Sequence, residues 1–573
     1  MKTLLVTLDS KFIHTNLAVR YLKNFCKDNN FDIEIKEFTI NQNQEYILRQ
    51  ILDVKADIIC FSCYIWNIEY IKEIANIIKE ANVNVKILFG GPEVSFEIEN
   101  LMENEIYIDY VIYGEGEITF NEFLKEIRLS NPNFDKINGL AYRDDGRIIV
   151  NNCRNLISNL DIVKYPYEED EQFENKIIYY ESSRGCPFNC SFCMSSIDKT
   201  IRNFSLNRVK RDLKKLLKTK ARQIKFVDRT FNTDYKRSIE IMKFIVENNH
   251  NNMRIHFEIT ADIINEEFLL YISTLPVNMF QFEIGVQSLN EETLREINRH
   301  MNIEKLYHVI NSIRINKNIH VHLDLIAGLP YENYETFKES FDGIYKLNAE
   351  KIQLGFLKVL KGTKIYMDKV YHNIKYRKKA PYEVICTKYI TLNEILKLKS
   401  IEELVDKYYN EKYFEYSINY ILENIYKESS FEFYEDFSEY WQQNDLYKVS
   451  HSRKRLYKIL YEFIKYRDKL TEKFISALRY DYVFNNQYEE LPSYLNKEYE
   501  ERYKYIKRLI ANDDEFRNQF FEDMSKEDKL INRFRIVDIE KDATLFIYKN
   551  KENIFNRCET LKINNWIKEY ENE

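Results

Sequence analysis

The sequence lacks three features that would place it in a common class of protein. It has no uninterrupted apolar run close to the roughly 18–20 residues that span a bilayer, so we expect no transmembrane helix. Its first residues, Met1 to Val6, form one short apolar strand and not a signal peptide. Positive charge is not in excess, since the net charge is −7 and the pI is near 5.9. This charge argues against a protein that binds nucleic acid mainly by electrostatics.

What is present indicates a large protein with several domains. A length of 573 residues suggests about three or four domains, and 45% apolar residues supply material for large cores. Nine cysteines are scattered along a chain without export features. That usage predicts a protein of the reducing cytoplasm.

Three of the cysteines lie together in Ser183-Arg184-Gly185-Cys186-Pro187-Phe188-Asn189-Cys190-Ser191-Phe192-Cys193. Thiolates are the usual ligands of iron–sulfur clusters, which normally have four corners. Ligands Cys186, Cys190 and Cys193 would leave one iron open to chelate a small molecule that has an amine and a carboxylate. A zinc knuckle or a disulfide loop is the alternative, but no fourth Cys or His lies nearby to complete a tetrahedral zinc site.

Before this loop, the chain alternates apolar strands with helices, which predicts a doubly wound parallel sheet. The expected strands include Leu4–Leu8, Phe31–Phe38, Asp57–Tyr64, Val85–Phe89 and Tyr110–Tyr113. No G-x-G-x-x-G follows the first strand, so a nicotinamide or flavin dinucleotide is not expected. Ligands of such sheets bind beyond the carboxyl ends of the strands. The candidate residues there are Asp9, Ser10, Thr15, Asn16, Ser62, Gly90, Gly91, Gly114, Glu115 and Gly116.

After the loop, the chain continues as strands separated by helices and then changes character. Six strands are expected, Ile177–Glu181, Ile224–Val227, Arg254–Ile259, Met279–Ile284, Val321–Ile326 and Lys351–Phe356. Barrel enzymes build their chemistry at the carboxyl ends of such strands, and the cysteine loop begins at the end of the first.

The strand–helix alternation stops beyond about Ala380. From Tyr408 to Tyr505 glycine is scarce and one proline occurs, which predicts a helical bundle with an aromatic core. A terminal hairpin is expected from Ile531–Val537 and Ala543–Tyr548. We therefore expect a sheet domain at 1–135, a hairpin and linker at 136–172, a partial barrel at 173–380 and a mostly helical domain at 381–573.

The spacing of Cys186, Cys190 and Cys193 resembles the cluster loop of the radical S-adenosylmethionine superfamily. The four strand-end loops of the first domain together resemble the cobalamin-binding domain of one of its subfamilies, the class B radical methyltransferases. With its aromatic helical tail, the chain resembles a subgroup of this family whose C-terminal domain is uncharacterised. The resemblance covers nearly the whole chain. It implies three cofactors, namely a [4Fe–4S] cluster, S-adenosylmethionine and cobalamin.

The resemblance also implies roles for individual residues. Phe192 matches the aromatic position that lies against the adenine, and Asp228 and Asn232 match the positions that hold the methionyl amine. The positions on the ribose and methionyl side are Glu258, Glu283 and Gln287, and those on the strand along the adenine are Ile326, Gly328 and Leu329. The chain lacks the D-x-H-x-x-G loop of cobalamin mutases, because His14 lies five residues after Asp9. No histidine ligand is therefore expected beneath the cobalt.

The resemblance implies that a 5′-deoxyadenosyl radical removes hydrogen from the substrate, which then collects a methyl group from cobalt. We expect a cobalamin-dependent radical methyltransferase that modifies an unactivated carbon of an unknown small molecule or peptide. A one-electron reductant of the flavodoxin or ferredoxin type would serve it. The alternatives are a cobalamin-assisted radical cyclase or rearrangement enzyme, and a non-catalytic corrinoid or redox sensor. Methylthiolation of tRNA is not favoured, since that family has three further cluster cysteines that this chain lacks.

Overall fold

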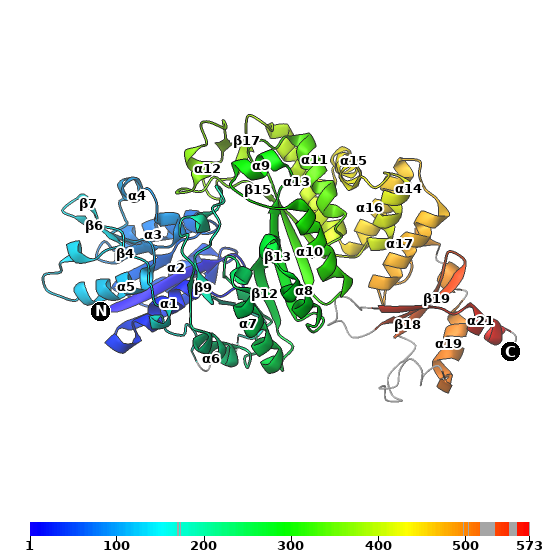
Figure 1. Cartoon of the computed structure of the whole chain (residues 1–573), viewed down its shortest axis with the longest axis horizontal. Coiled ribbons are helices and arrows are strands. Elements are labelled where there is room, and N and C mark those ends of the chain that lie inside the picture. Colours follow the sequence, from blue (N-terminus) through cyan, green and yellow to red (C-terminus); the bar gives the residue numbers. More distant parts are fainter. Residues whose placement is uncertain are drawn as a thin grey trace. The chain divides into compact units, whose positions relative to one another are not determined.

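The computed structural model describes residues 1–168, 171, 173–496, 498–501, 503–515, 533–548 and 558–571. They form two compact units (Figure 1). The first is made of Met1–Asn333 and Gly355–Leu392, and the second of Tyr334–Leu354 and Asn393–Glu573. Ile531, the first residue of the expected terminal hairpin, lies outside the described residues.

The first sheet has seven strands in the order β2-β1-β3-β4-β5-β6-β7. The strands from β2 to β5 are parallel, and the hairpin β6–β7 extends the sheet in antiparallel fashion. In this order the winding reverses between β1 and β3, so a ligand crevice is expected outside their carboxyl ends. The bounds are Lys2–Asp9 (β1), Asp32–Thr39 (β2), Ile58–Ser62 (β3), Lys86–Gly90 (β4), Tyr110–Ile112 (β5), Leu140–Asp144 (β6) and Arg147–Val150 (β7).

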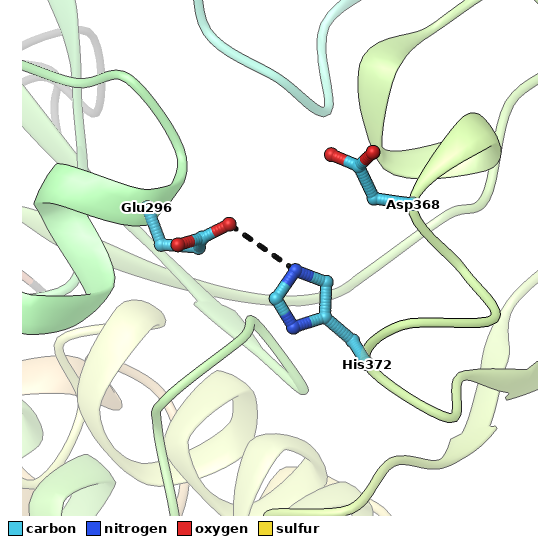
Figure 2. A group of neighbouring side chains, drawn as sticks. All are labelled: Glu296, Asp368 and His372. Atoms are coloured by element: carbon cyan, nitrogen blue, oxygen red, sulfur yellow. Dashed lines mark ion pairs between the residues drawn. The ribbon is translucent and has the colours of Figure 1, made fainter.

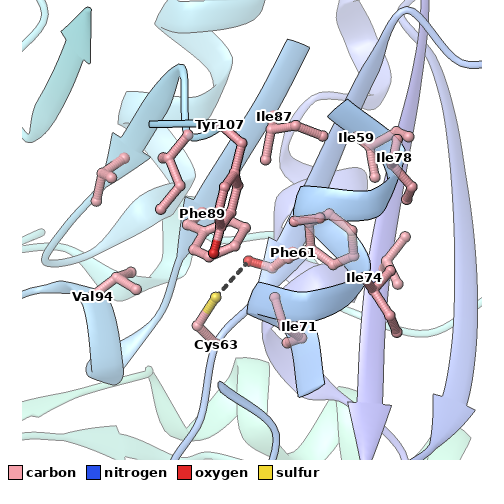
Figure 3. Packing of buried hydrophobic residues seen from close by; sticks show 14 of the residues in the cluster. Ile59, Phe61, Cys63, Ile71, Ile74, Ile78, Ile87, Phe89, Val94 and Tyr107 are labelled. Carbon is pink, nitrogen blue, oxygen red and sulfur yellow. Dashed lines mark hydrogen bonds between the residues drawn. The ribbon is translucent and has the colours of Figure 1, made fainter. Parts of the chain in front are cut away.

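Helices cover both faces of this sheet, and the doubly wound prediction is thereby confirmed. One face packs against α1 (Leu17–Phe25) and α5 (Gly116–Glu126). The other packs against α2 (Gln44–Leu52), α3 (Ile68–Ala81) and α4 (Ile98–Asn104). In α3, Ile68, Ile71, Ile74 and Ile78 recur at helical spacing and form one buried face, whereas Ile77 is exposed. Figure 3 shows how that face meets the aromatic side chains of the neighbouring strands, with Ile71, Ile74 and Ile78 beside Phe61 and Phe89.

The second sheet has six strands in the order β15-β14-β13-β12-β11-β8, as expected for the central segment. The pairings from β8 to β14 are parallel. The bounds are Ile177–Tyr180 (β8), Gln223–Phe226 (β11), Arg254–Ile259 (β12), Phe280–Gln287 (β13), His320–Ala327 (β14) and Lys351–Phe356 (β15). Intervening helices include α6 (Leu206–Leu216), α7 (Tyr235–Asn248), α8 (Glu266–Ser273), α9 (Glu291–Glu296), α10 (Ile303–Ile315) and α11 (Tyr334–Tyr345).

The two faces of this second sheet differ sharply in polarity. Along β13 the residues Phe280, Phe282, Ile284 and Val286 are buried, and the alternate positions are half-buried. The alternate positions of β13 and β14 are Gln281, Glu283, Gly285, Gln287, His320, His322, Asp324 and Ile326. Because side chains alternate across a strand, one face is an apolar core and the other is a polar face that can receive ligands.

The second unit is mostly helical, as expected. Its helices include α14 (Glu415–Asn424), α15 (Ser430–Gln443), α16 (Arg453–Tyr466), α17 (Glu472–Asn485) and α19 (Lys504–Asn512). The aromatic residues form the expected core, with Tyr408, Phe437, Trp441 and Tyr457 all buried. The expected hairpin is present as β18 (Phe534–Ile539) and β19 (Asp542–Tyr548). A third strand, β20 (Cys558–Lys562), pairs with β19 and was not expected.

Within the described residues, none of the helices combines the length and the apolar character needed to cross a membrane.

We expect the aromatic core of the second unit to depend strongly on Trp441. Trp441→Ala should lower the free energy of unfolding by about 3–5 kcal/mol, because it opens a cavity beside Tyr408 and Phe437. Trp441→Phe should cost less, since the indole N–H is buried without a partner among the described residues. Denaturant unfolding would measure both, with the exposed Tyr488→Ala as the control. Equal losses for the Ala and Phe variants would contradict this prediction.

Candidate functional site

The cysteine loop is held in shape by main-chain contacts on both sides. Cys186 and Cys190 are buried, Cys193 is half-buried, and all three are free thiols. The loop follows β9 (Ser183–Arg184), which pairs with β10 (Arg202–Asn203). Gly185 has φ +90°, and a Cβ there would lie 2.1 Å from Thr200 O. Only glycine fits this turn into the first cysteine.

Polar groups from distant parts of the chain reach two of the three sulfurs. Thr230 Oγ1 lies 3.6 Å from Cys186 Sγ, and Arg299 Nη1 donates to Cys190 Sγ at 3.8 Å. Burial raises the pKa of the Cys190 thiol, and the Arg299 guanidinium acts in the opposite direction. Three thiols from one loop, with a guanidinium donor at Cys190 Sγ, fit an iron–sulfur cluster bound through thiolates. Arg299 was missed by the sequence analysis, because no motif marks it and it lies 109 residues from Cys190.

Asp228 and Asn232, expected at the methionyl amine, already make hydrogen bonds within the protein. Asp228 is 1% exposed and accepts from Ser182 N at 2.8 Å and from the hydroxyls of Ser182 and Ser183 at 2.6 Å. Asn232 forms two bonds with the main chain of Thr260. Asp228 thus supports the start of the cysteine loop and Asn232 the end of β12. Their assignment to the amine stays a prediction.

Glu258, Glu283 and Gln287 lie on the polar face of the second sheet, and their assignment to the S-adenosylmethionine site stays a prediction. Glu258 and Glu283 are neighbours across β12 and β13. Lys225 Nζ lies 3.9 Å from Glu258 and 3.3 Å from Glu283, and His256 Nε2 lies 2.9 Å from Glu283. Burial raises the pKa of Glu258. For Glu283 burial acts in the same direction, but His256 and Lys225 outweigh it and lower its pKa to about 2.

Gln287 offers a specific reason to place a ligand at this face. Its Oε1 is buried and has no hydrogen-bond partner among the described residues. Its φ is +77°, at a point where the register of β13 with β14 shifts. A buried carbonyl oxygen without a donor is costly, so a hydroxyl or amine donor of a bound molecule suits this position. The residues present therefore fit S-adenosylmethionine.

The predicted adenine side is partly core. Leu329 is fully buried and Gly328 has φ +87°, whereas Ile326 and Phe192 are half-buried. Ile326 is on the polar face of β14. These residues stay predicted contacts of the adenine.

Strands β1, β3, β4 and β5 are adjacent and parallel, so the fold brings their strand-end loops to one edge of the first sheet. Gly91 has φ +116°, and a Cβ there would lie 2.5 Å from Cys63 O. Gly114 has φ +76°, and a Cβ there would meet no atom within 4 Å. Gly114 is exposed, and its assignment to cobalamin stays a prediction. Ser62 is buried, Ser10, Gly90 and Gly116 are half-buried, and Gly116 begins α5.

Thr15 and Asn16 mainly shape the loop after β1. Asn16 Oδ1 accepts from Val19 N and caps α1, and its Nδ2 donates to Thr7 Oγ1 at 2.9 Å. Thr15 Oγ1 donates to the main-chain oxygen of Ile177 in β8 at 3.1 Å. His14 also reaches this strand, because its Nδ1 lies 2.7 Å from the hydroxyl of Tyr179. The loop after β1 is thus attached to the first strand of the second sheet.

Glu115 joins the first sheet to the cysteine loop. Its carboxylate pairs with Arg184 and with Arg202, both at 3.0 Å, and also accepts from Ile157 N at 2.7 Å. Arg184 is 13% exposed and pairs further with Glu117 at 2.5 Å and Glu181 at 2.7 Å. Both oxygens of Glu115 are thus used within the protein. Its assignment to cobalamin stays a prediction.

The buried His372 connects its own segment to that of Glu296 (Figure 2), and both segments also contact the cysteine loop. His372 Nε2 lies 3.2 Å from Glu296 Oε1, and Asp368, which pairs with Lys364, lies nearby. The main chain of Ser191, in the cysteine loop, forms two hydrogen bonds with residues next to this group. Ser191 N donates to Ile297 O, and Ile365 N donates to Ser191 O. No sequence motif marks this cluster.

We expect Arg184 to be important for stability. Arg184→Met leaves three carboxylates close together with one fewer cation, which should cost about 3–5 kcal/mol. Thermal unfolding against the exposed Arg147→Met would measure the loss. A melting temperature equal to that of the control variant would contradict this prediction.

We expect Asp9 to make stability depend on pH. Burial, with Glu37 acting in the same direction, raises its pKa from 3.8 to about 7. Its stabilising contribution is thus complete below about pH 4 and is lost as the pH rises through about 7. Asp9→Asn should therefore gain stability relative to the unchanged protein between pH 5 and pH 8, by a few kcal/mol at about 1.4 kcal/mol per pKa unit.

Melting curves at the two pH values would test Asp9→Asn, with the exposed Asp32→Asn as the control. A pH trend of the opposite sign would contradict the assignment to Asp9.

Three family models match successive parts of the chain. A B12 binding domain matches residues 3–124, the radical SAM superfamily matches residues 180–344, and a protein of unknown function (DUF4080) matches residues 370–557. The first two contain the strand-end loops and the cysteine loop described above. The cofactors of a chain with these two domains are cobalamin, a [4Fe–4S] cluster and S-adenosylmethionine.

Individual relatives and solved structures agree with this order of domains. An uncharacterized methyltransferase of Pyrococcus horikoshii is 26% identical over 374 residues, which cover 62% of this chain and 78% of the relative. The cobalamin-dependent radical SAM methyltransferase TokK of Streptomyces tokunonensis is 24% identical over 329 residues, 54% of this chain and 47% of TokK. The match thus spans about half of TokK.

The cobalamin-dependent S-adenosylmethionine radical enzyme OxsB, solved with aqua-cobalamin bound, has the same fold. The TM-score is 0.60 at 16% identity, over 90% of this chain and 82% of OxsB. With a B12 binding domain, a radical SAM domain and a DUF4080 region in succession, the chain belongs to the cobalamin-binding radical S-adenosylmethionine enzymes.

Proposed function

We propose that the chain is a methyltransferase that transfers a methyl group to an unactivated carbon of a small molecule or peptide. The observation that carries this proposal is the ion pair between Glu115 and Arg184. It attaches the loop after β5, at the edge where cobalamin is expected, to the strand that leads into the cysteine loop. The loops to which we assign the two cofactors thus belong to one compact unit, which supports the proposal.

When bound, the cofactors supply a 5′-deoxyadenosyl radical and a methyl group, and the protein supplies the positions. Cys186, Cys190 and Cys193 would hold the cluster as thiolates. Gln287 would accept a hydrogen bond from S-adenosylmethionine through its unpaired Oε1. Gly114 would leave room for the corrinoid beyond β5.

The remaining residues would line the apolar and the polar sides of the S-adenosylmethionine site. Phe192, Ile326, Gly328 and Leu329 would form the apolar side of the S-adenosylmethionine site. Glu258 and Glu283 would line its polar side, because both lie on the polar face of the second sheet. A one-electron donor of the flavodoxin or ferredoxin type would reduce the cluster.

We expect each of the three cysteines to be essential. Cys186→Ala, Cys190→Ala or Cys193→Ala should lose most of the iron and reduce 5′-deoxyadenosine formation at least about 100-fold, because a cluster needs all three protein thiolates. Iron analysis and chromatography after anaerobic reconstitution would measure both. Cys153→Ala removes an exposed thiol and should behave like the unchanged protein.

Retention of S-adenosylmethionine cleavage in any of these three variants would contradict the assignment of the cluster ligands.

Methyl transfer itself can be tested with labelled S-adenosylmethionine. The protein, reconstituted anaerobically with cluster and cobalamin, is given an extract of anaerobically grown cells and S-adenosylmethionine with a deuterated methyl group. Methyl transfer predicts an extract compound that gains the label, as seen by mass spectrometry. Formation of 5′-deoxyadenosine with unlabelled products would favour a cyclase or rearrangement enzyme. No 5′-deoxyadenosine at all would favour a corrinoid or redox sensor.

A further inference from the structure

Arg299 connects a predicted cluster ligand to the end of β13. Its Nη1 donates to Cys190 Sγ at 3.8 Å, and its Nη2 donates to the main-chain oxygen of Gly285. The side chain is half-buried. Among the residues that the structure describes, no carboxylate lies within ion-pair distance of it. The positive charge beside Cys190 is therefore not neutralised by a neighbouring acid.

Main-chain hydrogen bonds fix the segment that carries Arg299 next to the cysteine loop. Ile297, two residues before Arg299, accepts from Ser191 N in the cysteine loop at 2.9 Å, and Arg299 N donates to Leu294 O at 2.8 Å. At Gly285 a Cβ would lie 2.3 Å from Gln287 Nε2 and 3.8 Å from Arg299 Nη2. Glycine at 285 thus leaves room for Gln287, while the guanidinium is held by its hydrogen bond to Gly285 O.

A cation at this position has a defined electrostatic consequence. One-electron reduction makes a cluster more negative, and a nearby positive charge stabilises the more negative form. Hydrogen bonds to the sulfur ligands act in the same direction and are among the factors that set cluster potentials. The effect of Arg299 is strengthened by partial burial, since screening by water is weaker there. Thr230, the polar neighbour of Cys186, is uncharged and therefore does not stabilise the more negative cluster by its charge.

We propose that Arg299 is a positioning residue that raises the reduction potential of the cluster through its N–H···S contact with Cys190. The cluster then accepts its electron more readily from a flavodoxin- or ferredoxin-type donor, and no bond to the protein is formed or broken. This inference rests on the cluster assignment of the proposed function and not on methyl transfer. The nature of the substrate does not enter into it.

The test is a redox titration of reconstituted protein, followed by electron paramagnetic resonance in the absence of S-adenosylmethionine. Arg299→Met removes the charge and both donors, whereas Arg299→Lys keeps the charge. Arg295→Met is the matched control, because Arg295 lies in the neighbouring helix α9 and is exposed. Iron content is measured for every variant, so that the potential refers to protein that carries the cluster.

We expect Arg299→Met to reduce the equilibrium constant for one-electron reduction at least tenfold, which is a fall of about 59 mV. Arg299→Lys should show less than half of that fall, and Arg295→Met none. An unchanged potential in Arg299→Met with the cluster present overturns the proposal. Loss of the cluster in Arg299→Met makes Arg299 a structural contact and also overturns it. Failure of the unchanged protein to bind any cluster overturns the cluster assignment as well, so the two failures are distinguishable.

Discussion

Arg184 lies among Glu115, Glu117 and Glu181, and the remainder of the site depends on this group of charges. The four side chains are between 7% and 14% exposed. Removing charges from water is costly, and the cost is offset only where the opposite charges meet in good geometry. Glu115 and Glu117 come from the start of α5, while Arg184 immediately precedes the turn at Gly185. The ion pairs therefore fix the distance between the first sheet and the cysteine loop.

The second sheet contributes a polar surface to the candidate site, because its two faces differ in polarity. Its buried face packs against helices, and the other face carries charged groups such as Lys225, Glu258 and Glu283. These charges are satisfied by each other and by His256, so the face is ordered without a ligand. At the end of β13, Gln287 Oε1 has no donor in the described part of the chain, and the buried His256 Nδ1 also lacks a hydrogen-bond partner there. An ordered polar face with unsatisfied polar atoms is a pre-formed binding surface, in which little rearrangement is needed on binding.

Much of the fold could be predicted from the sequence, because the signals are local. Apolar strands alternating with helices predict a doubly wound sheet and a second parallel sheet, and both are present. The scarcity of glycine and proline after Tyr408 predicts helices, and these form the second unit. The pairing of β20 with β19 could not be predicted, since Cys558–Lys562 is a short polar strand that gains its place only from its neighbour. Strand propensity in such a segment depends on context.

The candidate site, like the fold, could be predicted from the sequence only in part. By itself, the sequence determined the kinds of ligand available, because Cys186, Cys190 and Cys193 are adjacent along the chain and their spacing requires no fold to be recognised. Only the tertiary structure decided which groups surround them, since Arg299 and Thr230 reach the sulfurs across separations of 109 and 44 residues. It also decided that the carboxylate oxygens of Asp228 accept hydrogen bonds from Ser182 and that the carboxylate of Glu115 pairs with Arg184. A side chain's partners depend on long-range packing, which composition and spacing do not encode.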